Sequence, residues 1–284
     1  MTRRAFTVVE LAICLTLSLL VGACAMVVLP GTRCRCCSPS IKDSTQVRGI
    51  HQGLVMWAGN NSDRYPLPSQ LDAADETIAA PAASKDTTAN IISVLIYNGF
   101  FGPELCVSAR ESNPAIQQMV TYAYSAPATA AIPAKALWDP AFNADFTGGR
   151  TANFSYAHAL PSGPRLADWG NTFDGNLAVV GNRGPQVSSV TRSGSLSTPS
   201  FNTKSNTLLI HGKRTSWQGN ICYNDNHVNF ETNLFGAATY KIGVTSFEDC
   251  LFFDEQDDPT GRNSLLGVFT RSGATPGEFA WIWD

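Results

Sequence analysis

The sequence predicts an α+β protein, with an N-terminal transmembrane helix followed by a head in which an amphipathic helix packs on an antiparallel β-sheet. Residues 6–29 are almost uninterruptedly apolar, helical periodicity resumes at Ser44, and short alternating segments between turn residues fill the second half of the chain. We therefore expect four parts: a leader (1–5), a transmembrane and assembly helix (6–29), a joint containing Cys and Pro (30–43), and an extracytoplasmic globular head (44–284).

Composition narrows the classes of protein that fit this chain. Of the 284 residues, 44% are hydrophobic and only 15% are charged, and there are 23 Gly and 16 Pro, which is typical of a loop-rich exported domain. The net charge of −3 gives no basic footprint for nucleic acid, so we expect no such partner. The sequence contains no Gly-x-Ser-x-Gly, His-Glu-x-x-His, Walker or Gly-x-Gly-x-x-Gly motif, and we expect no enzymatic activity.

The N-terminal apolar run has the length of a membrane span. Its 24 residues would extend roughly 36 Å as a helix, enough to cross a bilayer with some tilt. Arg3 and Arg4 would keep the N-terminus in the cytoplasm and direct the head outward. Glu10 stands out in this run, because a carboxylate in a membrane helix costs about 2.5–3.5 kcal/mol at the helix centre.

The segment Arg4-Ala-Phe-Thr-Val-Val-Glu-Leu11 resembles the processing motif of type IV prepilins and type II secretion pseudopilins. The resemblance implies that a prepilin peptidase cleaves between Ala5 and Phe6 and that Phe6 is then N-methylated. It also implies that Glu10 pairs with the Phe6 amine of a neighbouring subunit, so that the buried charge is compensated and helps to set the stagger between subunits. Ala5 departs from the family, where Gly usually precedes the cut.

Two other processing schemes compete with this one. Val21-Gly-Ala-Cys24 loosely resembles a lipobox, which would make Cys24 a lipidated N-terminus. The run Ala23-Cys-Ala25 also fits a small-x-small signal-peptidase site. Neither alternative accounts for Glu10, so the prepilin interpretation is favoured.

A joint and an amphipathic helix follow. Pro30 and Pro39 are expected to break the first helix. The second helix should begin with Asp43 or Ser44 as its cap, and it should bury an apolar stripe and end at 59–61. The stripe consists of Val47, Ile50, Leu54 and Trp57. Residues 46–66 resemble a segment of large pseudopilin-like families, in which a helix is followed by a polar turn and Tyr-Pro.

The second half of the chain is predicted to be rich in strands. Strands are expected at 153–157, 177–180, 207–210, 220–223 and 227–230, and loops at 126–150 and 181–206. Asn224-Asp-Asn226 suits a tight hairpin turn, because Asn and Asp tolerate left-handed conformations. Residues 219–236 resemble the Asp-Gly-His-Val hairpin of the same families, with Asn226 in place of Gly, and His211 approximately matches their upstream His.

Three groups of residues are candidates for metal or redox chemistry. Cys34, Cys36 and Cys37 lack partners at zinc spacing, so a disulfide or a free thiol is favoured. His211 and His227 lie near the predicted hairpin, where a turn-stabilising role is favoured over a metal or catalytic pair.

The acidic run near the C-terminus provides hard oxygen ligands. Its candidate calcium ligands are Asp254, Glu255, Asp257 and Asp258. Some pseudopilins resembling this chain bind calcium in a C-terminal loop, and the alternative is a solvated acidic turn.

The sequence thus predicts a non-enzymatic filament subunit. Its expected partners are a prepilin peptidase, the cytoplasmic membrane, and copies of itself or related subunits in a helical pilus or pseudopilus. The alternative is a membrane-anchored extracytoplasmic binding module for a glycan or secreted substrate. If lipid were attached at Cys24, this module would be a lipoprotein.

Overall fold

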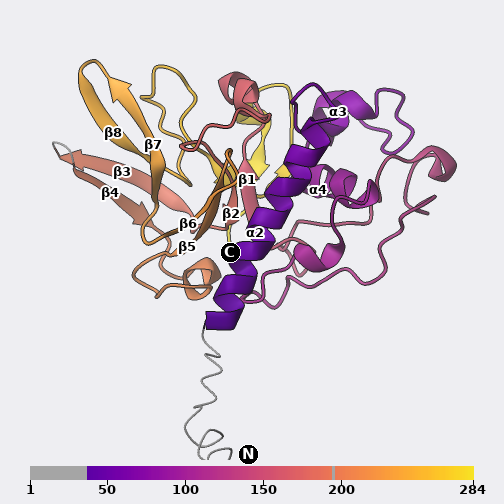
Figure 1. The fold of residues 1–284 in the computed structure, drawn as a ribbon, viewed down its shortest axis with the longest axis horizontal. Coiled ribbons are helices and arrows are strands. Elements are labelled where there is room, and N and C mark those ends of the chain that lie inside the picture. The colour runs from indigo at the N-terminus through magenta and orange to yellow at the C-terminus, as the bar shows by residue number, and fades with distance from the viewer. Residues whose placement is uncertain (1–36, 194–195) are drawn as a thin grey trace, which may run out of the picture. The chain divides into compact units, whose positions relative to one another are not determined.

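The computed structural model describes residues 37–193 and 196–284 (Figure 1). Of two compact units in the chain, the larger covers residues 39–284 and contains every element below except the first two residues of α2. The predicted leader, transmembrane helix and most of the predicted joint lie outside the described residues.

Helix α2 (Cys37–Ala58) is the longest described helix. Val47, Ile50 and Leu54 recur at helical spacing and are at most 1% exposed, which confirms the apolar stripe expected from the sequence. The side chain of Asn61 donates to the Trp57 carbonyl at 2.8 Å, and the chain then turns through Ser62, which has a positive φ of 54°. The helix therefore ends where Gly59 and two asparagines stop the periodic pattern.

Two further α-helices and six short 3-10 segments are described. The α-helices are α3 (Pro68–Leu71) and α4 (Thr88–Tyr97), and Thr87 caps α4 by accepting from the Asn90 N–H. The 3-10 segments are η1 (Ala82–Lys85), η2 (Pro103–Leu105), η3 (Pro133–Lys135), η4 (Gly163–Asp168), η5 (Asn206–Leu209) and η6 (Pro276–Glu278).

The central sheet has five antiparallel strands in the order β6-β5-β2-β1-β9. These strands are β1 (Tyr156–Ala159), β2 (Ala178–Asn182), β5 (Gly219–Tyr223), β6 (Val228–Glu231) and β9 (Leu266–Gly267). Three two-stranded sheets accompany it. They pair β3 (Val187–Ser193) with β4 (Leu196–Phe201), β7 (Phe235–Ile242) with β8 (Thr245–Cys250), and β10 (Phe269–Arg271) with β11 (Ala280–Trp281).

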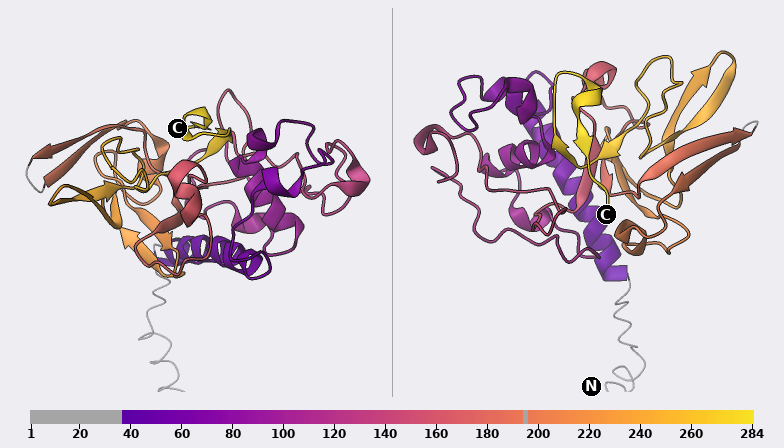
Figure 2. Two further views of the ribbon diagram at one scale, coloured as in Figure 1. Left: turned by 90° about the horizontal axis from the view of Figure 1, so that it is seen from above. Right: turned by 180° about the vertical axis from the view of Figure 1, so that it is seen from behind.

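The buried apolar side chains of the described residues form three clusters, of which the smallest contains Leu160 and Phe269. The largest core packs α2 and α4 against the central sheet, as Ile50, Leu95 and Val180 illustrate. The second core lies under the hairpins β3–β4 and β7–β8 and contains Trp217 and Phe252. Both hairpins project from the side of the head away from α4 (Figures 1 and 2). The view from behind shows β10 and β11 on the face opposite α2 (Figure 2).

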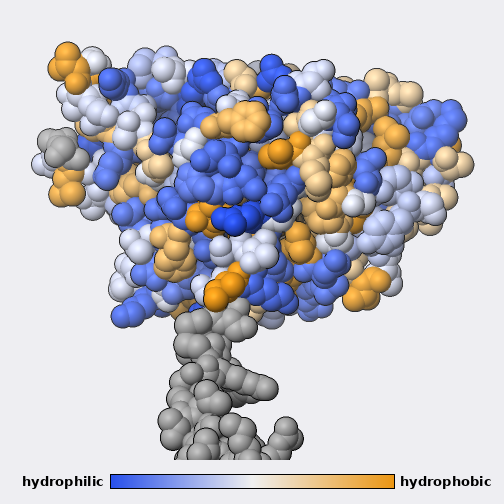
Figure 3. All heavy atoms as spheres, viewed as in Figure 1, coloured by the Kyte–Doolittle hydropathy of each residue, from blue (hydrophilic) through white to orange (hydrophobic). Residues whose placement is uncertain are grey.

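The predicted fold class is wrong. Within residues 37–193 and 196–284, no helix is long and apolar enough to cross a membrane. The longest described helix, α2, carries exposed polar residues such as Thr45, Arg48 and Gln52, which a bilayer would not accept. Hydrophilic residues cover much of the face on which α2 lies (Figure 3). Among the described residues, strands in several sheets with few helices stand where a pilin-like head with one sheet was expected, because the two hairpins build a second core instead of joining that sheet.

Several local predictions also differ from the structure. Residues 37–43, assigned to the joint, belong to α2, and a proline near the start of a helix is tolerated because it removes an N–H that has no partner there. Residues 207–210 are not a strand: η5 covers 206–209, after Ser205 accepts from the Thr207 N–H. Residues 187–193 and 196–201, expected as loop, pair with each other as β3 and β4. The hairpin of β5 and β6 is confirmed.

Candidate functional site

The N-terminal part of α2 is fixed to the head by a buried carboxylate. Asp43 is fully buried, and its two oxygens accept hydrogen bonds from four side chains in distant parts of the chain. Oδ1 accepts from Ser108 and, at 3.0 Å, from the Tyr156 hydroxyl. Oδ2 accepts from His211 Nε2 and from Asn220 Nδ2, both at 2.8 Å.

The charge state of Asp43 follows from these contacts. Burial would raise its pKa, but hydrogen bonds from His211 and Ser108, attraction to the imidazole, and the Asn220 amide together hold the pKa below its ordinary value. Asp43 is therefore an ionised carboxylate whose oxygens are all occupied. Among the described residues it contacts, Ser108 donates to Asp43 rather than to the imidazole, which is not the arrangement of an activated nucleophile.

A second polar contact joins α2 to the β5–β6 turn. His51 is buried, with Nδ1 3.1 Å from Asn226 Oδ1 and Nε2 3.1 Å from the Tyr65 hydroxyl. Tyr65 in turn donates to Asn224 Oδ1 at 3.0 Å. The segments that resemble pseudopilin-like families, residues 46–66 and 219–236, thus touch at this junction, although about 160 residues separate them.

Burial dominates the electrostatics of the junction. It lowers the pKa of His51, an effect that the hydrogen bond to Asn226 and the charge of Asp225 only partly oppose. Burial also raises the pKa of Tyr65 well above its ordinary value. Both shifts favour the uncharged forms of His51 and Tyr65.

The other two histidines of interest do not form a pair. His211 bonds to Asp43, whereas His227 lies beside Asp225 at 2.5 Å and stacks on the Tyr223 ring at 4.7 Å. His211 also meets the edge of Phe230, with ring centroids 5.5 Å apart. His227 thus contacts its own turn, whereas His211 reaches a carboxylate on α2 that lies 168 residues away in the sequence.

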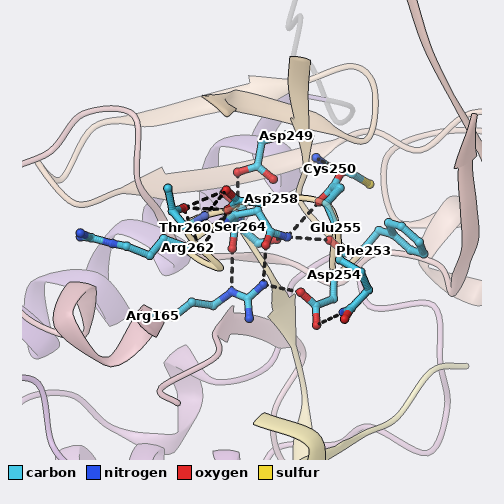
Figure 4. A network of polar contacts seen from close by, with 12 residues as sticks. Arg165, Asp249, Cys250, Phe253, Asp254, Glu255, Asp258, Thr260, Arg262 and Ser264 are labelled. Atoms are coloured by element: carbon cyan, nitrogen blue, oxygen red, sulfur yellow. Dashed lines mark hydrogen bonds and ion pairs between the residues drawn. The ribbon is translucent and has the colours of Figure 1, made fainter. Parts of the chain in front are cut away.

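The acidic run folds into a network of separate contacts with the rest of the head (Figure 4). Asp254 pairs with Arg165 at 2.5 Å, and Asp257 pairs with Arg192 at 2.6 Å. Asp258 closes the turn that follows it by accepting from the N–H groups of Thr260, Arg262 and Asn263 at 2.8–3.0 Å.

Glu255 is the most buried acid of this run, at 2% exposure. Its Oε1 accepts from the Cys250 N–H at 3.0 Å, and its Oε2 accepts from Asn263 Nδ2 at 2.9 Å. Burial, followed by repulsion from Asp249, raises the pKa of Glu255 to about 8. Burial likewise raises the pKa of Asp249 to about 6, although the N–H of Ser264 bonds to it.

This geometry does not assemble the predicted calcium ligands. Asp254, Glu255, Asp257 and Asp258 are each bound by protein donors, with Asn263 shared by Glu255 and Asp258 and Arg192 lying near both Asp257 and Glu255. Across the part of the chain that the structure describes, no three Asp, Glu, His or Cys side chains are arranged to hold a metal ion.

The remaining predicted site residues divide by location. Ala5, Phe6, Glu10 and Cys24 lie outside the described residues. Cys106, Cys222 and Cys250 are buried free thiols. The prediction of Asp43 as a helix cap is wrong, because α2 begins at Cys37. The role of Asp43 as a buried acceptor was missed because each of its four partners is at least 65 residues away.

Comparisons with known proteins add no further constraint. The chain matches no family model, no curated protein and no solved structure.

Proposed function

We propose that this protein is a structural subunit of a pilin-like filament, either a type II secretion pseudopilus or a type IV pilus. A prepilin peptidase would cleave between Ala5 and Phe6, Phe6 would be N-methylated, and the head would be displayed outside the cytoplasm. The observation that carries the proposal is Glu10, which becomes the fifth residue of the processed chain. A carboxylate at that place in an apolar run is costly unless a cation of another subunit pairs with it.

The head provides independent support. Residues 46–66 and 219–236, the other segments that resemble pseudopilin-like families, meet through His51, Tyr65, Asn224 and Asn226. Two resemblances that were separate in the sequence are therefore one structural unit in the head. That unit ties α2, the helix nearest the N-terminal motif among the described elements, to the central sheet.

The processing step is tested by mass spectrometry of the mature protein from cells that express a prepilin peptidase. We expect a chain that begins with N-methylated Phe6. A chain that begins with a lipidated Cys24 would overturn the proposal in favour of an anchored binding module.

Assembly is tested by the variant Glu10→Ala. We expect Glu10→Ala to accumulate as folded protein but to be lost from sheared filaments by at least tenfold, because the pairing with a neighbouring Phe6 amine is removed. Glu248→Ala is the matched control, since Glu248 is an exposed carboxylate on β8 of the head. Equal amounts of Glu10→Ala and wild type in filaments would contradict the proposed role.

A further inference from the structure

A cleft lies between the β7–β8 hairpin and the loop 258–264. Its volume is about 490 Å³, and residues 174–177 and the end of η4 complete its walls. Four carboxylates and one guanidinium line it: Asp168, Asp174, Asp249, Asp258 and Arg262. A cleft of this volume is within the usual range for a small ligand or an inserted side chain.

The β7–β8 pairing places Asp249 at an irregularity beside the cleft. Phe235 pairs with Cys250 and Thr239 pairs with Glu248, so three residues of β7 lie opposite Asp249 alone. Such bulges interrupt the ladder and change the direction of the side chains beside them. Asp249 consequently points away from the regular ladder toward the loop 258–264, where its Oδ2 accepts from the Ser264 N–H at 2.7 Å (Figure 4).

One oxygen of this carboxylate has no partner. Asp249 is 2% exposed and lines the cleft, and its Oδ1 is buried without a hydrogen-bond donor among the described residues. Buried carboxylate oxygens are normally satisfied, because desolvation without a hydrogen bond is costly. A donor supplied from the cleft would satisfy Oδ1.

The charges around the cleft determine what kind of donor fits. Arg262 Nε donates to Asp168 Oδ2 at 2.8 Å, so these two lining charges offset each other. Asp174, Asp249 and Asp258 form no ion pair with a basic residue of the lining, and Arg262, which also feels the charge of Asp174, is already paired with Asp168. Asp174 is exposed at the cleft, and within the described part of the chain its carboxylate accepts only from the nearby Asn176 N–H at 2.9 Å.

We propose that this cleft binds an organic cation, a primary ammonium or guanidinium group, whose N–H donors reach Asp249 and whose charge is balanced by Asp174 and Asp258. A compact metal ion fits less well, because no three acidic or imidazole groups converge among the described residues. The same chemistry is available from a small polyamine or from a lysine or arginine side chain of another protein. Filament assembly is not required for the proposed binding.

The test is isothermal titration calorimetry on the purified full chain at pH 7.5 and low salt. The probes are spermidine, a tetralysine peptide and, as a neutral control, cellotetraose. We expect saturable binding of at least one cationic probe at one site per chain and no binding of cellotetraose. Preference for spermidine would identify a small-molecule site, and preference for tetralysine would identify a site for a protein side chain.

Variants localise the binding. Asp249→Asn keeps the size of the side chain and removes its charge, and we expect it to weaken binding at least tenfold. Glu248→Gln, which removes a charge from the adjacent exposed position of β8, should change the affinity less than twofold. Circular dichroism verifies that each variant is folded. If Asp249→Asn is not folded, the exposed Asp174→Asn decides, with an expected loss of at least threefold.

Three results would overturn the proposal. They are the absence of saturable binding by both cationic probes, an equal loss of affinity in Glu248→Gln and Asp249→Asn, and tighter binding of cellotetraose than of either cation. The second result would assign the binding to diffuse surface attraction, and the third would assign the cleft to neutral glycans.

Discussion

Replacing Asp43 by alanine removes the single acceptor that four buried donors share. Ser108, Tyr156, His211 and Asn220 would each lose a hydrogen bond to a charged group, and such bonds contribute about 1.5–3 kcal/mol each. The losses are not additive, because water and small rearrangements satisfy some of the donors. Breaking a buried ionic contact by removing one partner typically costs about 3–5 kcal/mol, and we expect Asp43→Ala to lower the free energy of unfolding by that amount.

Urea denaturation of the purified full chain, followed by tryptophan fluorescence, measures this change. Lys42→Ala is the matched control, since Lys42 is the exposed neighbour of Asp43 on α2 and should change stability by less than about 0.5 kcal/mol. A loss below about 1 kcal/mol for Asp43→Ala would refute the view that this carboxylate fixes the helix to the head.

The pH dependence provides a second check on the same residue. The folded-state pKa of Asp43 is lowered, so its contribution to stability is fully present above the unfolded pKa of about 4. That contribution is lost as the pH falls below this value through the folded pKa. The difference in stability between wild type and Asp43→Ala should therefore shrink in acid.

Three further perturbations follow from the described contacts. Lys85→Met leaves the buried carboxylate of Asp72 without its partner at 2.8 Å and should cost about 3–5 kcal/mol in urea denaturation, whereas the exposed Lys135→Met should cost less than about 1 kcal/mol. Because the pKa of Glu255 is raised from 4.5 in the unfolded chain to about 8 in the fold, its protonated form stabilises the fold below pH 4.5, and this contribution is lost as the pH rises through about 8. The free energy of unfolding of the wild type should therefore fall between these pH values, and Glu255→Gln should flatten the profile. Asn226 has a φ of 68°, which alanine adopts less readily than glycine. In thermal denaturation, Asn226→Ala should lower the free energy of unfolding by roughly 2–3 kcal/mol and Asn226→Gly by only about 1 kcal/mol. Equal losses of stability in the two variants would rule out backbone strain as the cause.

Local patterns predicted the elements that their own residues determine. The stripe Val47, Ile50 and Leu54 marked the buried face of α2, because helical spacing places these side chains on one side. The residues 224–226 marked the β5–β6 turn, since Asn226 adopts the positive φ that the turn requires.

The elements that were missed depend on distant parts of the chain. The β3–β4 pair is rich in Ser and Thr, with mostly exposed or half-buried side chains, so its sequence resembles a loop. It is held by cross-strand pairing and by the packing of Val187 in the second core. The acidic run looked like a calcium loop because sequence order alone could not show that Arg165 and Arg192 would neutralise its members.

Asp43 and His51 lie on the buried face of α2 among apolar residues, and this placement suggests what the polar contacts are for. The two positions are eight residues apart, about 12 Å along a helix, and each meets a different set of partners in the head. Apolar packing alone would tolerate sliding of the helix by one turn, but a buried carboxylate moved away from its donors would lose all of its hydrogen bonds. We infer that the polar contacts set the register of α2 on the central sheet. In a filament subunit this register would fix the orientation of the head on the helix, because two separated polar anchors allow neither translation nor rotation of α2.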